Sequence, residues 1–121
     1  MSVSQVNREI ISTDIYTWDE LFNIHGTRNA INHSEENIIS VLSGNDFHND
    51  EIEPDKVIYK IPNRKYYKKS IERFNKQIIN QKSFKLFHKL KTNSWAYLGE
   101  YLVSEINPSD KNYILIFIKA P

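Results

Sequence analysis

Residues 43–59, SGNDFHNDEIEPDKVIY, form the most informative stretch of the sequence. It holds two aromatic residues, Phe47 and Tyr59, with the carboxylate of Asp50 between them. The intervening residues are polar and rich in turn formers. Two aromatic faces and one hydrogen-bond acceptor are the groups that hold a flat heteroaromatic ring. The stretch therefore indicates a pocket that reads a single nucleic-acid base.

A strongly basic segment follows at once. Residues 60–91 contain eleven lysines and arginines and one acidic residue, Glu72, giving a net charge of +10. The rest of the chain has five basic and fourteen acidic residues, a net charge of −9. Such segregation is typical of a surface that binds a polyanion, although a solvated lysine-rich helix face is the alternative. We expect seven residues to contact a DNA backbone: Lys60, Arg64, Lys65, Lys68, Lys69, Arg73 and Lys76.

Length and composition limit the class of protein. The 121 residues, 40% of them hydrophobic and fifteen of them aromatic, suit one folded domain spanning residues 1–121. There is no cysteine, which excludes disulfides and thiolate metal sites. No apolar run approaches the roughly 18 residues of a membrane span, and the N-terminus shows no secretion signal. We therefore expect a cytoplasmic protein without a membrane partner.

Two helices are predicted. Thr17-Trp18-Asp19-Glu20 is a capping-box pattern, so a short helix should run from Trp18 to about Ile24 and stop at Gly26. Apolar residues recur at helical spacing between residues 64 and 80, which predicts a longer amphipathic helix with lysines on its other face.

Apolar runs bounded by turn residues predict about five strands. These cover residues 37–43, 57–61, 83–88, 95–106 and 112–119, with residues 45–55 as a loop. Gly99 should mark a bulge or a close backbone approach within the fourth strand. Five strands with one short and one longer helix favour the α+β class, as a small, curved, partly closed β-barrel.

Several short motifs occur in a characteristic order. The first is SVLSG (residues 40–44), followed by an aromatic residue, two further residues, Asp50 and, nine residues on, Tyr59. FNK (74–76), KLF (85–87) and YLGEYLV (97–103) come later, and HGTR (25–28) comes before them. Together these motifs resemble the SRA (SET- and RING-associated, or YDG) domains, whose fold is PUA-like. YLGEYLV is similar to the family's Tyr-Asp-Gly-x-Tyr-x-Val signature, and HGTR occupies the place of a family turn. The resemblance spans roughly residues 22–106.

The sequence also departs from the family pattern. Leu98 stands where the signature has Asp, and Phe47 stands where Tyr is commoner. The glycine-rich turn after Tyr59 is replaced by residues 60–63, KIPN, and the region of the long base-displacing finger is short. These differences affect base extrusion more than the pocket itself.

The resemblance implies a function. SRA domains bind double-stranded DNA, flip out a modified cytosine and enclose it in a pocket. Carried onto this chain, it implies a non-catalytic reader of modified cytosine, 5-methylcytosine above all, with Phe47, Asp50 and Tyr59 as the pocket. No cofactor and no metal are expected. The module would serve as the specificity part of a bacterial restriction or defence protein, with a nuclease or helicase in another domain or subunit.

The chemistry of such a pocket is independent of the family. Asp50 would accept a hydrogen bond from the exocyclic amine of cytosine, and backbone N–H groups of residues 45–49 would donate to its acceptors. Stacking on Phe47 and Tyr59 is worth about 1–3 kcal/mol per base. Each residue also has a structural interpretation: Phe47 as a core aromatic, Tyr59 as a half-buried strand residue, and Asp50 as a turn cap.

Two other functions remain open at this point. The PUA-like barrel with a basic groove would serve RNA equally well. A small metal-dependent nuclease is the enzymatic alternative, since His48 lies beside Asp46 and Asp50. The four histidines show no recognisable metal-ligand spacing, and the carboxylate-and-lysine pattern of nucleases is not visible.

Overall fold

The computed structural model describes residues 14–44 and 50–121. Phe47 and the residues beside it, 45–49, lie outside this part of the chain. In chain order the described elements are β1 (Ile15–Tyr16), α2 (Trp18–His25), β2 (Ile31–His33), β3 (Ile38–Ser43), β4 (Glu51–Glu53), β5 (Lys56–Pro62), the 3₁₀ helix η1 (Lys65–Tyr67), α3 (Lys68–Asn80), β6 (Phe84–Lys91), β7 (Ser94–Pro108) and β8 (Asn112–Lys119).

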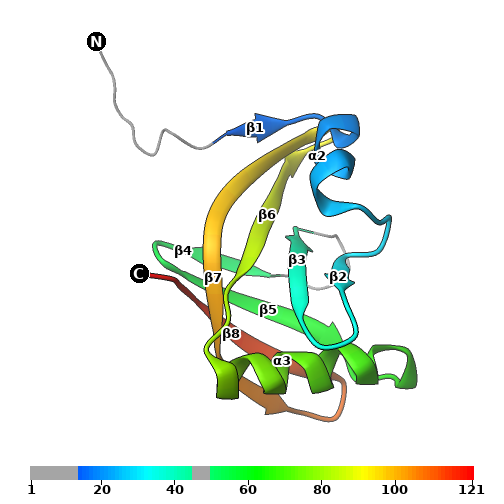
Figure 1. Ribbon diagram of the computed structural model, residues 1–121, viewed down its shortest axis with the longest axis vertical. Helices are drawn as coiled ribbons and strands as arrows, with labels where there is room; N and C mark the ends of the chain where they lie inside the picture. Colours follow the sequence, from blue (N-terminus) through cyan, green and yellow to red (C-terminus); the bar gives the residue numbers. More distant parts are fainter. Residues whose placement is uncertain (1–13, 45–49) are drawn as a thin grey trace.

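The strands form one curved sheet, with the long, bent β7 running through its middle (Figure 1). The strand order is β2-β3-β6-β7-β8-β5-β4, and β1 pairs with β7 off this path. β3 and β6 run parallel, whereas the other pairs are antiparallel. Among the described strands, β2 and β4 stay at the edges, so the sheet does not close. The predicted α+β fold with a partly closed barrel is confirmed.

The larger hydrophobic cluster lies between the sheet and α3, which lies across one end of the sheet (Figure 1). Phe74 of α3 is fully buried. Its ring meets Phe84 of β6 edge-on at 5.9 Å and Phe117 of β8 at 5.6 Å. Burying a side chain of this size contributes about 1.5–3 kcal/mol, so α3 is held mainly by this aromatic contact.

A second hydrophobic cluster lies under α2, at the other end of the sheet. It joins Leu21 of α2, Leu42 of β3, Phe87 of β6 and Trp95 of β7. The neighbouring Val41 belongs to the larger cluster. Because successive side chains of a strand point to opposite faces, β3 is buried on both sides, which explains its almost continuous apolar run.

Both predicted helices are present. The Thr17 hydroxyl accepts from the N–H of Glu20 at 3.3 Å, and the Glu20 carboxylate accepts from the N–H of Thr17 at 2.8 Å, so the capping box is formed. Gly26 ends α2 at φ +79°. The long helix differs from its prediction only at its start, because η1 replaces its first turn. No helix in the described ranges is long and apolar enough to cross a membrane.

The five predicted strands are present as β3, β5, β6, β7 and β8. The count of about five is nevertheless wrong, since the described sheet has eight strands. The prediction of a loop over residues 45–55 fails at β4, whose three residues pair with β5 across a tight turn. All three side chains of β4 are exposed. A strand without a buried face leaves no alternation to detect, and β1 and β2 are as short as β4 or shorter.

The predicted irregularity at Gly99 is confirmed. Leu86 of β6 pairs with Gly99, whereas the next residue, Phe87, pairs with Tyr97, so Leu98 is the extra residue of a β-bulge. Bulges bend a strand and increase its twist. This one lies in β7, where the sheet curves most visibly (Figure 1).

Candidate nucleic-acid interface

The end of β3 is fixed by its parallel neighbour β6. Ser43 pairs with His88 in the sheet, and the Ser43 hydroxyl lies 2.9 Å from Nδ1 of the His88 ring. Gly44 then turns the chain at φ +91°, a conformation that costs other residues free energy. A Cβ on Gly44 would lie 3.0 Å from the backbone nitrogen of Lys89 and 3.1 Å from the His88 ring. A residue with a Cβ would therefore be strained at position 44, and glycine is favoured where the chain leaves β3.

Asp50 connects this turn to β5. One carboxylate oxygen accepts from the N–H of Gly44 at 3.3 Å, and the other accepts from the N–H of Lys60 at 3.0 Å. Asp50 therefore caps two backbone segments that are distant in the sequence. A carboxylate can accept about four hydrogen bonds, so this structural role is compatible with an additional contact to a base.

Tyr59 of β5 lies on the inner face of the sheet, where only 3% of its surface is exposed. Its hydroxyl donates to the carbonyl of Leu42 at 3.0 Å, and its ring stacks on Phe117 with centroids 5.2 Å apart. Burial, and secondarily the charge of Asp50, raise the pKa of Tyr59 far above its usual value. The hydroxyl is therefore a permanent donor, and one face of the ring is already occupied.

Of the three predicted pocket residues, Asp50 and Tyr59 both bind backbone groups at the end of β3, and Phe47 lies outside the described residues. The Tyr59 ring is closed to solvent in this conformation. Stacking on a base through its second face would need that face to be uncovered, and it stays a prediction.

His88 is the residue that sequence reasoning missed. Burial lowers the pKa of His88 below its usual value, and the negative charge of Asp50 acts in the opposite direction. Its proximity to Ser43 follows from parallel pairing across 45 positions, and neither spacing nor periodicity reveals such pairing. We refer to Ser43, Gly44, Asp50, Tyr59 and His88 as the β3-end cluster.

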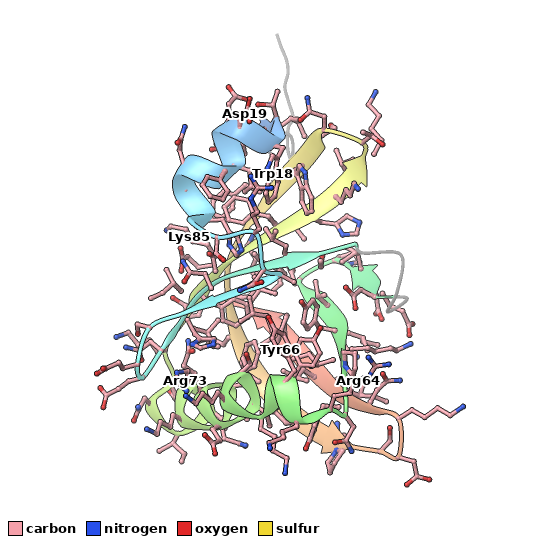
Figure 2. The ribbon with its side chains drawn as sticks, turned by 90° about the vertical axis from the view of Figure 1, so that its right-hand side faces the viewer. Trp18, Asp19, Arg64, Tyr66, Arg73 and Lys85 are labelled. Atoms are coloured by element: carbon pink, nitrogen blue, oxygen red, sulfur yellow. The ribbon has the colours of Figure 1, made fainter. Side chains whose placement is uncertain are left out.

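A second region is basic. Arg64, Lys65, Lys68, Lys69 and Lys76 are exposed on η1, on α3 and just before them, and we call these residues the basic surface. Across the described ranges, none of their side chains forms an ion pair. Figure 2 shows Arg64 and Arg73 toward opposite ends of this helical segment. The charge is therefore spread along one side of the fold and open to an approaching polyanion.

The other two predicted backbone contacts are partly engaged within the protein. Lys60 lies on the outer face of β5, opposite the buried residues, and its ammonium is 3.8 Å from the Glu51 carboxylate. Arg73 donates through Nε to the carbonyl of Ser34 at 2.6 Å and through Nη1 to that of Lys69 at 3.3 Å. Arg73 therefore also fastens the β2–β3 turn to α3.

The described residues give little support to metal-dependent chemistry. Within residues 14–44 and 50–121, no three histidine, aspartate or glutamate side chains gather as a metal site. His25 is fully buried between Ser40 and the carbonyl of Asn29. Because a carbonyl oxygen only accepts hydrogen bonds, Nε2 of His25 carries the hydrogen. Burial lowers the pKa of His25, which favours the neutral ring. His25 is therefore a structural residue. The nuclease alternative involved residues 46 and 48, which are outside the described ranges.

Solved structures share this arrangement of strands and helices. A SUVH5 SRA domain in complex with hemi-methylated CG DNA matches with a TM-score of 0.68 and 19% sequence identity, over 84% of this chain and 79% of that chain. A SUVH5 SRA domain bound to fully hydroxymethylated CG DNA matches with a TM-score of 0.70 and 16% identity, over 90% and 88%. The chain has the SRA fold.

A third SRA structure, a SUVH5 complex with methylated CHH DNA, gives a TM-score of 0.66 and 18% identity over 84% of this chain and 80% of that chain. No protein-family model and no curated protein matches the sequence. The SRA likeness therefore rests on the backbone fold.

Proposed function

We propose that the chain is a non-catalytic DNA-binding module that recognises double-stranded DNA containing modified cytosine, with 5-methylcytosine as its main target. The observation that carries the proposal is the position of Asp50 beside Tyr59 at the end of β3, in a chain with the SRA fold. The neighbouring SRA structures were determined with methylated or hydroxymethylated DNA.

In the proposed complex the cytosine leaves the helix and enters the β3-end cluster. The Asp50 carboxylate accepts from the exocyclic amine, a contact that an unpaired base offers on its Watson–Crick edge. Phe47 and Tyr59 are the proposed stacking partners, with Tyr59 contributing the face that does not contact Phe117. Stacking of about 1–3 kcal/mol per base offsets much of the cost of unstacking the base.

The basic surface supplies affinity that does not depend on sequence. Its five residues are exposed and without ion pairs in the described part of the chain, so they are available to phosphates. Lys60 and Arg73 complete the proposed backbone contacts, although both also hold protein groups. Affinity from such contacts falls with salt as counterions are released.

We further propose that residues 1–121 act as one module of a restriction or defence protein in the cytoplasm, with a nuclease or helicase in another domain or subunit. A module that only binds DNA would need a partner of that kind to cut or unwind it.

The proposal is tested by titrating matched duplexes that carry unmodified, 5-methyl or 5-hydroxymethyl cytosine, together with the equivalent RNA. We expect the modified duplexes to bind at least tenfold more tightly than the unmodified one. A fluorescent base analogue next to the modified cytosine should brighten on binding, because its neighbour leaves the stack. Equal binding to all duplexes, or tighter binding to RNA, would reject a modified-cytosine reader in favour of a general or RNA-binding module.

A further inference from the structure

A cavity of about 220 Å³ lies between β2 and the start of α3. Its lining includes Asn29, His33, Tyr66, Lys69 and Ser70, and none of the lining residues belongs to the β3-end cluster. Figure 2 shows Tyr66 above α3, between the positions of Arg64 and Arg73. The volume equals that of roughly seven water molecules. It accommodates a phosphate group together with part of an attached sugar.

Ser70 is the unusual residue of this cavity. Only 7% of its surface is exposed, yet its hydroxyl has no hydrogen-bond partner anywhere in residues 14–44 and 50–121. The hydroxyl is therefore available to a molecule that enters the cavity. Because a hydroxyl can donate a hydrogen bond, it favours a ligand with exposed oxygen atoms.

The charge of the lining favours an anion. Lys69 carries an exposed ammonium without an ion pair in the described ranges, and none of the described lining residues carries a carboxylate. Tyr66 is 72% exposed and stands edge-on to Tyr67, with centroids 4.9 Å apart and planes at 89°. Its open ring offers an apolar surface at the rim, beside the charged group.

We propose that this cavity binds one phosphodiester group, with the Ser70 hydroxyl and the Lys69 ammonium on its oxygen atoms and the Tyr66 ring against the adjoining sugar. The proposal rests on the proposed function in taking the DNA backbone as the source of that group. Inorganic phosphate is the other source of the same chemistry, and the experiments separate the two.

Ser70→Ala gives the sharpest test, because the two possible roles of Ser70 change stability in opposite directions. If the hydroxyl serves only a ligand, its removal leaves the melting temperature of the free protein unchanged or raised, since no protein hydrogen bond is lost and Ala favours a helix more than Ser does. DNA affinity should fall about fivefold or more, as expected for a hydrogen bond to a charged group. A lowered melting temperature with unchanged affinity would overturn the proposal.

Lys69→Gln and Lys76→Gln form a matched pair on the same helix, since only Lys69 lines the cavity. Lys69→Gln in the Ser70→Ala background should lose less affinity than in the wild-type background, because both groups hold one phosphate. Lys76→Gln should lose the same affinity in either background. If the Ser70→Ala background reduced the affinity loss of Lys69→Gln and of Lys76→Gln equally, Lys69 and Ser70 would not share one phosphate.

Inorganic phosphate, titrated while the backbone amide NMR signals of Lys69 and Ser70 are followed, distinguishes the sources. Competition of phosphate with DNA at these signals supports the proposal. The proposal would be overturned if phosphate shifted these signals but Ser70→Ala had the same DNA affinity as the wild-type protein. The proposed function is judged separately by the affinity ratio of methylated to unmodified duplex, which Ser70→Ala should not change. Loss of duplex affinity in Ser70→Ala without any methyl preference would uphold the cavity and reject the reader.

Discussion

The β3-end cluster and the basic surface are built in opposite ways. At the end of β3, side chains form hydrogen bonds to the backbone. Asp50 accepts from two N–H groups, and Tyr59 donates to a carbonyl. Gly44 is confined by neighbouring backbone and ring atoms. On η1 and α3, the lysines project from a helix whose stability depends on its buried face. The first region depends on the position of each atom, whereas the second depends on the number of charges. From this difference follows the proposed division of roles: the β3-end cluster recognises the base, and the basic surface binds DNA of any sequence.

Gly44→Ala should have the largest effect, because it disturbs the whole β3-end cluster. The new Cβ would lie 3.0 Å from the backbone nitrogen of Lys89, at a φ of +91°. Backbone strain at such a φ costs about 1–3 kcal/mol, and the close contact adds to it. Urea unfolding should show a loss of at least that size. Gly26→Ala is the control, since it has a similar φ of +79° but meets only Asn32 at 3.7 Å. An equal loss in both variants would mean that Gly44 is not sterically confined.

Asp50→Ala should separate the two regions most clearly. Methylated-duplex affinity should fall about tenfold or more, because the buried amine of the cytosine loses its acceptor. Affinity for unmodified DNA should hold or rise, since a negative charge is removed. The melting temperature should also fall, because the N–H groups of Gly44 and Lys60 lose their partner.

The affinity ratio of methylated to unmodified DNA isolates the pocket from the loss of stability, because both duplexes are titrated with the same protein. Asp50→Asn should be intermediate, since it keeps one carbonyl acceptor. Asp110→Ala, in the exposed β7–β8 turn, should leave the ratio unchanged. If the ratio of methylated to unmodified affinity stayed at the wild-type value in Asp50→Ala, Asp50 would serve only as a loop cap and would not contact the base.

Replacing Lys65, Lys68 and Lys69 with glutamine should weaken binding to both duplexes equally. The slope of log affinity against log salt should become shallower by about 0.9 for each phosphate that the variant no longer neutralises. Filter binding between 50 and 200 mM salt, a range of about fourfold, measures the slope. Lys56→Gln with Lys111→Gln removes charge outside the basic surface and should leave the slope almost unchanged. A wild-type slope in the triple variant would mean that α3 faces away from the DNA.

Stability should fall as the pH is lowered from about 7 toward 5. Burial lowers the pKa of both His25 and His88 in the folded protein. Below the usual histidine pKa of about 6.5 the unfolded chain binds more protons than the folded one, so acid favours unfolding. His88→Gln should reduce this dependence in urea titrations, and His25 should account for what remains. Stability that rises on acidification would show that the charge of Asp50 outweighs burial at His88.

The sequence predicted the parts of this molecule that depend on neighbours along the chain. The capping box of α2, the buried face of α3 and the bulge at Gly99 are local signals, and all three are confirmed. The five longer strands, β3, β5, β6, β7 and β8, were also found. β1, β2 and β4 were missed, because strands of two or three residues cannot show a period.

The candidate site was only partly accessible from the sequence. The spacing of Asp50 and Tyr59 indicated a pair, and in the structure both side chains bind backbone groups at the end of β3. The contact of Ser43 with His88 depends on a parallel pairing between distant strands, for which the sequence holds no local signal. The burial of Tyr59 against Phe117 depends in the same way on the pairing of β5 with β8.

The pairing of β5 with β8 also has a consequence for how the protein is made. Seven residue pairs join Lys56–Pro62 to residues 112–118, so β5 lacks this complete neighbour on the ribosome until residue 118 has emerged. Until then β5 presents unpaired backbone groups along one edge, and such an edge is prone to pair with other chains. Contacts of such long sequence separation also form slowly. The barrel is therefore completed only after its last strand, β8, has been synthesised, and until then both β5 and β7 lack a neighbour.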